Sequence, residues 1–581
     1  MQLKPGFAAA RGKDVWLAMA VALCLSFVLG QDVLGNVWRT GVFIDPDDAA
    51  RMVQIRDWMG GQGWYDLHLH RLGFPGADQM HWSRVVDAPV ATLVRLFGFF
   101  LEAPFAERAA RIGFPLLLML ALLGTAAAVA RELVGEAGVL PALVLLALSG
   151  LPAGQFQPGR IDHHAPQILL RVLALLCLLR ALDPVRGFRH GFLCAACLSL
   201  SLAISVENLP ETLVMGAAFP LLWALEGKIR KAALKGFGLG VILVLPVVLG
   251  ATLPPASWLR TSCDAASIPH FTLAMTGAGL CLAMVQCEAH LTQARARWGA
   301  LIACGLLLPS LLLTLFPACA GDPYTGLDPV VRALWLNHVL EARSLFEAMH
   351  EQPNPTLIYL VPALIGLAGM AIVAWKMRDE RRLKWLLLIC VTLCALATTI
   401  WKVATISAFA ALGCFGAMGL IALLPEALQS CRLVPAVVFS GLGALFVLPA
   451  QTINLSAHAA EGCLAPESFI DFAALPQGLV VAPIDSGAHV LAFTRNSVLA
   501  APYHRNNAGN RLSLDVFRLP ADEAMEHLRG SGADYLAICG SAKTSPLGAA
   551  LTEGRVFDGL TKLDAGGPYS LWRINIAKAS R

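Results

Sequence analysis

Residues 236–253 read GFGLGVILVLPVVLGATL, a run of 18 positions without a charged side chain. A helix needs about 20 mostly apolar residues to cross the hydrocarbon core of a bilayer, so the run is typical of a membrane-spanning helix. Lys228, Arg230, Lys231 and Lys235 precede it, and such basic residues indicate the cytoplasmic end of a span. The stretch therefore predicts both a transmembrane helix and its direction.

The composition extends this interpretation to the whole chain. Of 581 residues, 57% are hydrophobic and only 14% are charged, and the mean hydropathy is +0.64. A soluble domain usually carries about 25% charged residues, so these charges are too few to cover a water-soluble surface. The same values exclude a disordered chain, a coiled coil and collagen. A net charge of +4 without a basic domain argues against nucleic acid as a partner.

Similar apolar runs recur along the chain and predict about thirteen spans. The first, roughly 15–29, follows a basic stretch with Lys4, Arg11 and Lys13, and we interpret it as a retained signal-anchor. A signal peptide with a cleavage region near residues 33–35 is the alternative. The other runs are 111–130, 138–153, 166–182, 191–206, 208–225, 236–253, 271–288, 299–317, 355–375, 385–400, 405–424 and 433–449.

The connections between these runs are of two kinds. Alternate connections are basic, so by the positive-inside rule they lie in the cytoplasm together with the N-terminus. The opposite connections carry acidic residues, histidines, prolines and aromatics, and we expect them outside: the first loop (32–110), the second loop (154–165), loop 254–270, loop 318–354 and the tail from about 450. The basic residues are Arg131; Arg180, Arg186 and Arg189; Lys228, Arg230, Lys231 and Lys235; Arg295 and Arg297; and Lys376, Arg378, Arg381, Arg382 and Lys384.

Two domains follow from this reading: a transmembrane domain, 1–449, and an outer domain formed by the tail, 450–581. In the tail, residues 478–482 (GLVVA) and 535–538 (YLAI) predict buried strands, and 521–528 predict a short amphipathic helix. The predicted fold is a polytopic α-helical membrane protein with a C-terminal α/β domain.

Most of the 15 cysteines fall within predicted spans and act there as small apolar residues. This includes the C-x-x-C pair Cys194 and Cys197, for which we expect no redox or zinc chemistry. Four cysteines are expected outside, where an oxidising compartment permits disulfides. The natural pairs are Cys463–Cys539 within the tail and Cys263–Cys319 between two loops.

The polar and charged residues that are candidates for catalysis or metal binding cluster at the outer ends of the predicted spans. In the first loop, FIDPDDAAR (43–51) places Asp45, Asp47 and Asp48 within four residues. Adjacent carboxylates repel one another unless a cation offsets them, and a divalent metal is the usual solution. The alternative is that Asp45 and Pro46 begin a helix with the other acids at its positive end. The two interpretations are compatible.

Further along the first loop, GWYD (63–66) and MHWSRVVDAP (80–89), which includes Arg84, suit a membrane-surface helix near a sugar or phosphate. Interfacial anchoring by tryptophan is the alternative. The second loop reads QPGRIDHHAPQ (157–167) and places Asp162 beside two histidines at the mouth of a span. Asp and His both ligate metals, whereas a structural polar plug is the alternative.

Three more candidates are single residues at outer ends. Glu341 lies in WLNHVLEARS (335–344), which is otherwise typical of a solvated helical face. Lys402 follows Trp401 near the end of the eleventh span, where it either snorkels or contacts a lipid phosphate. Glu207, between the fifth and sixth spans, ranks lower.

Together these motifs resemble the catalytic subunit of oligosaccharyltransferase, a GT-C membrane glycosyltransferase, over nearly the whole chain. Members of that family carry an acid in the first outer loop, a D-x-D/E-like motif in the second, a glutamate in the fifth, and a basic residue near the eleventh span. The resemblance implies that the catalytic residues are Asp47, Asp162 and Glu341. It implies a divalent metal, Mg or Mn, held by Asp47, Asp162, His164 (in place of the second acid) and Glu341. Donor phosphate contacts are expected from Lys402, Arg84 and Arg160.

The family's W-W-D-Y-G motif, which reads the Ser or Thr of an acceptor sequon, is absent. The tail has APIDSG (482–487) and APYHRN (501–506) instead, so we expect a retained donor side and a changed acceptor side. The expected acceptor-binding residues are Asp485, His504 and Arg505.

The resemblance therefore predicts transfer of a sugar or oligosaccharide from a polyprenyl-phosphate or polyprenyl-diphosphate donor to a glycan, lipid or protein acceptor. We expect the chain in a bacterial inner membrane, with the tail in the periplasm. A GT-C enzyme that transfers one sugar to a lipid or glycan is an alternative. A transporter or flippase is the non-enzymatic alternative, although the unusual polar residues gather at one face and no P-loop opens a helix.

Overall fold

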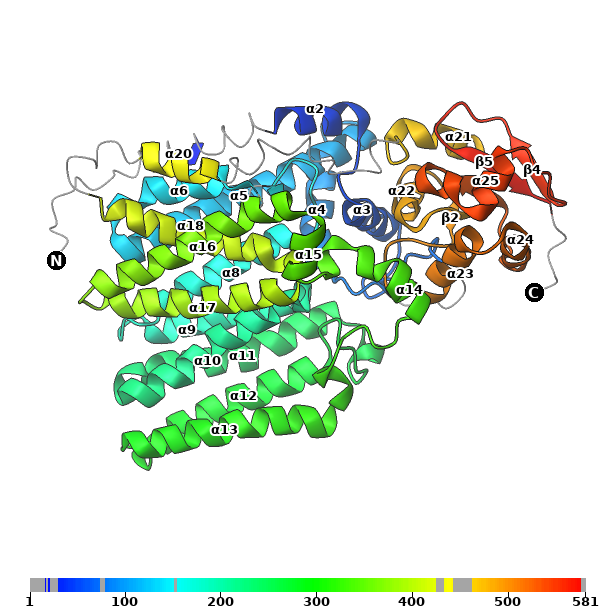
Figure 1. The fold of residues 1–581 in the computed structure, drawn as a ribbon. Helices are drawn as coiled ribbons and strands as arrows, with labels where there is room; N and C mark the ends of the chain where they lie inside the picture. The colour runs from blue at the N-terminus through cyan, green and yellow to red at the C-terminus, as the bar shows by residue number, and fades with distance from the viewer. Residues whose placement is uncertain are drawn as a thin grey trace.

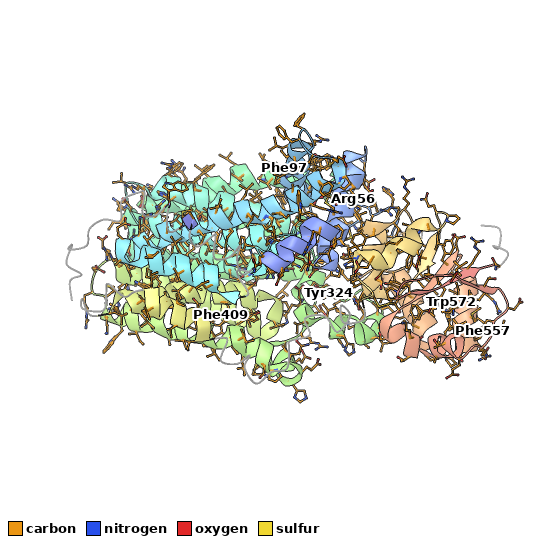
Figure 2. All side chains as sticks on the ribbon, turned by 90° about the horizontal axis from the view of Figure 1, so that it is seen from above. Arg56, Phe97, Tyr324, Phe409, Phe557 and Trp572 are labelled. Carbon is orange, nitrogen blue, oxygen red and sulfur yellow. A yellow bond between two sulfur atoms is a disulfide. The ribbon has the colours of Figure 1, made fainter. Side chains whose placement is uncertain are left out.

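The long helices of the molecule lie side by side at one end, and a small sheet with its own helices lies at the other (Figure 1). Between them are α3 (Pro46–Met59) and α4 (Arg84–Phe97), both from the first loop. Seen from above, Tyr324 lies between the helical bundle, marked by Phe409, and the tail, marked by Trp572 (Figure 2). This computed structural model describes residues 16, 19–20, 30–73, 79–150, 154–424, 433–442 and 462–575.

Each apolar run between residues 111 and 424 coincides with a helix, in the predicted order. α20 (Leu433–Gly441) matches the start of the final run; the remainder of that run and almost all of 15–29 lie outside the described residues. Residues 33–35 belong to α2 (Gln31–Thr40). The matching helices are α5 (Ala103–Val134), α6 (Val139–Leu148), α8 (His164–Arg180), α9 (Gly187–Ile204), α10 (Leu209–Glu226), α11 (Lys231–Thr252), α12 (Ile268–Gln286), α13 (Ala294–Leu315), α16 (Pro353–Lys376), α17 (Arg381–Trp401) and α18 (Ile406–Ala422).

Among the described residues, eight segments are long and apolar enough to cross a membrane. One of them, Val206–Thr252, contains both α10 and α11. Two other helices that match predicted spans are shorter, with 10 residues in α6 and 17 in α8. The protein is thus a multi-pass helical membrane protein, whereas the count of thirteen spans and the orientation stay predictions.

Two pairs of helices in the bundle approach closely through glycine. A methyl group on Gly416 of α18 would overlap the carbonyl oxygen of Gly366 in α16, and one on Gly236 of α11 would overlap the carbonyl oxygen of Phe188 in α9. Small residues at such crossings let helix backbones pack directly, which is the usual source of helix association in lipid.

The tail contains a five-stranded sheet of order β2-β1-β3-β5-β4. β1 pairs in parallel with β2 and β3, while β5 pairs antiparallel with β3 and β4. The two predicted strands and the predicted helix are confirmed as β1, β3 and α24. The bounds are β1 (Leu479–Val481), β2 (Ser497–Val498), β3 (Tyr535–Ile538), β4 (Leu560–Leu563), β5 (Ser570–Ile574), α22 (Gly487–Phe493), α23 (Asn507–Arg518), α24 (Ala521–Gly530) and α25 (Pro546–Thr552).

The first loop adds a short segment to the edge of this sheet. Leu72 forms a parallel bridge with Val498 of β2. The Val498 N–H donates to the Arg71 carbonyl at 2.8 Å, and the Gly73 N–H donates to the Val498 carbonyl at 2.7 Å. The Arg71 guanidinium also donates to the carbonyl oxygens of Leu491, Thr494 and Asn496. The first loop and the tail therefore share one hydrogen-bonded edge.

Both predicted disulfides are present in the structure. Cys463 pairs with Cys539 within the tail. Cys263 pairs with Cys319, so loop 254–270 is joined covalently to loop 318–354 across the α12–α13 pair.

Candidate active site

The three acids of the first loop lie at the beginning of α3. Asp45 is the N-cap, and its side chain accepts a hydrogen bond from the Asp47 N–H at 2.9 Å, with Pro46 at the first helical position. This confirms the capping interpretation for Asp45. Asp47 and Asp48 occupy the first turn, so both carboxylates lie at the positive end of the helix.

One guanidinium connects the acids of the first and second loops. Arg160 lies 2.9 Å from Asp45, 3.4 Å from Asp48 and 3.3 Å from Asp162, measured between nitrogen and carboxylate oxygen. Asp48 is fully buried and accepts a hydrogen bond from the Ile161 N–H at 2.7 Å. Burial raises the pKa of Asp48 to about 7, although the Arg160 charge opposes this rise. Because Arg160 serves three carboxylates, it holds the two loops together.

The start of α8 adds a network of histidines and carboxylates. The Asp162 carboxylate contacts Nδ1 of His163, whose Nε2 lies 3.1 Å from a Glu207 oxygen. Nε2 of His164 lies 3.3 Å from Asp162 and 3.6 Å from Glu341. Burial disfavours the charged imidazole, yet Asp162 and the other carboxylates raise the pKa of His164 to about 9. Glu207, ranked low from the sequence, therefore belongs to the cluster.

Asp47 faces this network from α3. Ligand atoms of Asp47, Asp162 and His163 lie within 4.8 Å of one another. Burial, followed by repulsion from Asp162, Asp45 and Glu341, raises the pKa of Asp47 well above its ordinary range. A carboxylate destabilised by like charges is relieved by a bound cation. The residues present thus fit a divalent metal ion.

The metal-binding set differs in detail from the predicted one. His163, and not His164, shares the compact group with Asp47 and Asp162. His164 forms a second such group with His163 and Glu207. Glu341 reaches the cluster through His164, from a short helical turn, Leu340–Ala342, and its side chain is 54% exposed.

Lys402 is the C-cap residue of α17. Its Nζ is 4.5 Å from the centre of the Tyr324 ring and 5.0 Å from that of Trp401. Burial lowers the pKa of Lys402, while Asp322 and Glu207 partly offset this effect. The next residue, Val403, donates its N–H to the Arg343 carbonyl at 2.8 Å, which ties the end of α17 to the segment that carries Glu341.

Arg84 is not brought together with Lys402 and Arg160. Its fully buried guanidinium lies 3.1 Å from Asp87 and donates to the carbonyl oxygens of Gln54 at 2.9 Å and Asp66 at 2.7 Å. These bonds stay within the first loop. The structure therefore gives Arg84 the geometry of a brace for that loop.

A cleft of about 370 Å³ lies beside the cluster. Trp82 lines it, and the Trp82 ring lies 6.4 Å from that of His163 and 5.4 Å, edge-on, from that of Tyr503. The cleft is formed by the first loop, loop 254–270, loop 318–354 and the tail, through residues that include His81, Trp82, Asp264, Tyr324, His504 and Arg505.

Two of the three predicted acceptor residues line this cleft. Nε2 of His504 lies 2.7 Å from the Asp264 carboxylate, and the Arg505 guanidinium donates to it at 2.8 and 3.0 Å. Burial opposes ionisation of Asp264, but the bonds from His504 and Arg505 hold its pKa well below the usual range. Asp485 lies in the turn Ile484–Ser486 before α22 and is not among the described residues that line the cleft.

Several residues of the site escaped the sequence analysis. Asp264 directly follows Cys263. A charged residue beside a cysteine that is expected outside could have marked Asp264 as a candidate. His163 stood in the quoted motif but received no role. Tyr503 stood in the quoted stretch 501–506 beside two predicted acceptor residues but received no role. Tyr324 reaches the site only because distant segments meet, and no local pattern marks it.

No model of a protein family matches the chain, and no curated protein matches it by sequence. Solved structures do match. The Archaeoglobus fulgidus oligosaccharyltransferase in the apo form has a TM-score of 0.68 at 14% identity, over 91% of this chain and 70% of that one. The oligosaccharyltransferase AglB of the same organism, in complex with an inhibitory peptide and a dolichol-phosphate, gives 0.64 at 14% identity, over 98% and 75%. Its complex with Zn and sulfate gives 0.63 at 14% identity, over 96% and 73%. The chain thus shares the GT-C fold of oligosaccharyltransferases, as the resemblance predicted.

Proposed function

We propose that this chain is a GT-C glycosyltransferase that transfers a sugar or oligosaccharide from a polyprenyl-linked donor to an acceptor on the periplasmic side of the membrane. The observation that carries the proposal is the convergence of Asp47, Asp162, His164 and Glu341, from three separate loops, beside a polar cleft. The shared fold supports it, and the dolichol-phosphate bound to the archaeal neighbour supports this donor class.

Asp47, Asp162 and His163 would hold a divalent cation, Mg or Mn, with His164 and Glu341 beside them. When bound, the cation supplies positive charge that stabilises the charge developing on the leaving phosphate. The Zn and sulfate in one neighbour structure support the presence of a metal in this fold.

Lys402 is the residue that we assign to the donor phosphate. Cleavage of a glycosyl–phosphate bond leaves negative charge on the phosphate, and a preorganised, partly desolvated cation stabilises it. Lys402 is half-buried against the Tyr324 ring, and its charge interacts with that of Glu207, a member of the cluster. Arg160, already bonded to three carboxylates, positions those carboxylates.

The acceptor enters through the cleft in this proposal. Asp47 orients the acceptor nucleophile or takes its proton. His504 and Arg505, held by Asp264, contact the acceptor. Glu341 completes the site from the short helical turn Leu340–Ala342.

The test compares membranes that contain wild type, Asp47→Asn, Glu341→Gln, Lys402→Met and the control Glu526→Gln, an exposed carboxylate of α24. Each receives radiolabelled polyprenyl-linked saccharide and a total-envelope acceptor mixture, with and without EDTA. We expect wild type and Glu526→Gln to transfer label. The three site variants should lose at least about 100-fold in rate, the usual cost of removing one charge-stabilising group.

Chelation by EDTA should abolish transfer, and added Mg or Mn should restore it. The mass increase of the labelled acceptor separates block transfer from single-sugar transfer. If wild type consumed no donor yet moved labelled lipid between leaflets, the transferase assignment would be wrong and a transporter would replace it.

A further inference from the structure

A third group of side chains that could bind a metal lies away from the catalytic cluster, in the first-loop sequence YDLHLH (65–70). In extended backbone, alternate side chains point to opposite faces. Leu67 and Leu69 are each only 5% exposed and pack into the protein. Asp66, His68 and His70 therefore share the other face, where the His70 side chain is 62% exposed.

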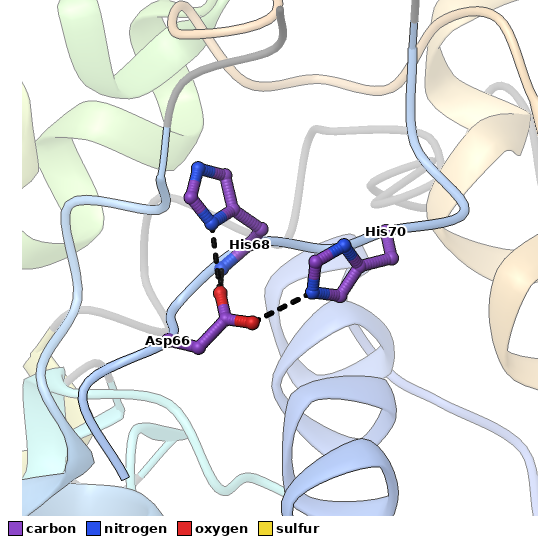
Figure 3. A group of neighbouring side chains, drawn as sticks. All are labelled: Asp66, His68 and His70. Carbon is purple, nitrogen blue, oxygen red and sulfur yellow. Dashed lines mark hydrogen bonds and ion pairs between the residues drawn. The ribbon is translucent and has the colours of Figure 1, made fainter. Parts of the chain in front are cut away.

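The Asp66 carboxylate lies between the two imidazole rings and directs one oxygen toward each (Figure 3). One Asp66 carboxylate oxygen lies 2.7 Å from Nδ1 of His68, and the other lies 2.7 Å from Nε2 of His70. All three ligand atoms fall within 4.8 Å of one another.

The backbone that carries these side chains is held by hydrogen bonds from its surroundings. Gln62 donates its side-chain amide to the His68 carbonyl at 2.8 Å, and the buried Arg84 donates to the Asp66 carbonyl at 2.7 Å. The Met80 N–H donates to the Leu67 carbonyl at 3.1 Å. With both leucines buried as well, the three ligands are preorganised, which lowers the cost of binding an ion.

We propose that Asp66, His68 and His70 form a zinc site, distinct from the cation site of the catalytic cluster. Two imidazoles and one carboxylate are a donor set that suits Zn²⁺, whereas Mg²⁺ prefers oxygen ligands. Ligand atoms around a tetrahedral zinc lie about 3.4 Å apart at the usual bond lengths. Small side-chain rotations would open the present 2.7 Å pairs to that spacing, and water would take the fourth position.

The site would fasten the first loop to the bundle. The two residues before Asp66 already bond to the end of α11: Trp64 donates its indole N–H to the Ala251 carbonyl at 2.6 Å, and the Tyr65 hydroxyl donates to the Gly250 carbonyl at 2.9 Å. An ion bound to the next residues stiffens this attachment. The role is structural and does not depend on the glycosyl transfer proposed above.

The experiment measures zinc binding by the full-length protein in detergent, by equilibrium dialysis and elemental analysis in excess Mg²⁺. The variants are His70→Ala, Asp66→Asn, which keeps the side-chain shape, and the control His527→Ala, an exposed histidine of α24. His70→Ala should bind one zinc ion fewer per protein at the zinc concentration that fills the wild-type site. Its Kd for zinc at this site should rise more than about 100-fold. Loss of a residue that only supports a ligand costs up to about 100-fold, and loss of the ligand itself should cost more. His527→Ala should bind as wild type does.

His163→Ala separates this site from the catalytic cluster, because His163 belongs to both candidate metal groups there. The visible absorption of bound Co²⁺ that survives in His163→Ala should vanish in His163→Ala/His70→Ala. If His70→Ala and Asp66→Asn bound as much zinc as wild type, with unchanged affinity, the proposed site would not exist.

Discussion

His489 lies in α22 with only 1% of its surface exposed, and its ring stacks 6.3 Å from that of Phe469. Burial lowers the pKa of His489 to about 4, although Asp45 partly opposes this effect. The unfolded chain has a histidine pKa of about 6.5, so between these two values the unfolded state binds more protons. The stability that neutral His489 contributes is therefore complete above pH 6.5 and is lost as the pH falls toward 4.

We predict that His489→Gln weakens this pH dependence. Wild type should lose up to about 3 kcal/mol of stability from this group between pH 6.5 and 4, and the variant, which has no such titration, should lose less. Thermal unfolding followed across that pH range measures the difference. Identical pH profiles for wild type and His489→Gln would contradict the assignment, and His527→Gln serves as the exposed control.

At the scale of elements, α16 and α18 pack through Gly366, Gly413 and Gly416, where backbone meets backbone. We predict that Gly416→Val separates the two helices and lowers the midpoint of thermal unfolding, at a cost of about 1–3 kcal/mol. Gly305→Val in α13 is the matched control, because a Cβ placed there meets no atom within 4 Å apart from the nearby backbone of its own helix. Equal midpoints for the two variants would show that the close packing contributes little.

The sequence predicted the elements that hydrophobic burial alone determines. The spans, β1 and β3 are nearly continuous apolar runs, and their positions follow from that pattern. β2 has two residues, and β4 has two exposed residues between half-buried ends, so neither carries such a signal. The acids of α3 and the second loop were recognisable because clustered carboxylates and histidines are rare in a sequence with only 14% charged residues. Tyr324 was not, because only tertiary folding brings it to the site.

At the scale of the whole molecule, the predicted orientation can be tested at two exposed valines. Val185 lies between α8 and α9 and is 93% exposed, and Val556 lies in the tail and is 88% exposed. We predict that Val556→Cys reacts with a membrane-impermeant maleimide in cells with a permeable outer membrane. Val185→Cys should react only after the inner membrane is disrupted.

The parent protein sets the background of this labelling, because Cys287, between α12 and α13, is an exposed free thiol. The opposite pattern, with Val185→Cys labelled first, would invert the topology. It would also place both disulfides in the reducing cytoplasm, where such bonds rarely persist.

The bridge between Leu72 and Val498 limits which fragments of the protein can be produced separately. Val498 offers its N–H and carbonyl at the rim of the sheet, and the only described backbone that satisfies them on that side comes from residues 71–73. A fragment that began after residue 461 would lose this cover and present unpaired strand groups to other chains, a common route to aggregation. The natural unit for expression and labelling is consequently the entire polypeptide, and a soluble fragment would need residues 71–73 grafted beside β2.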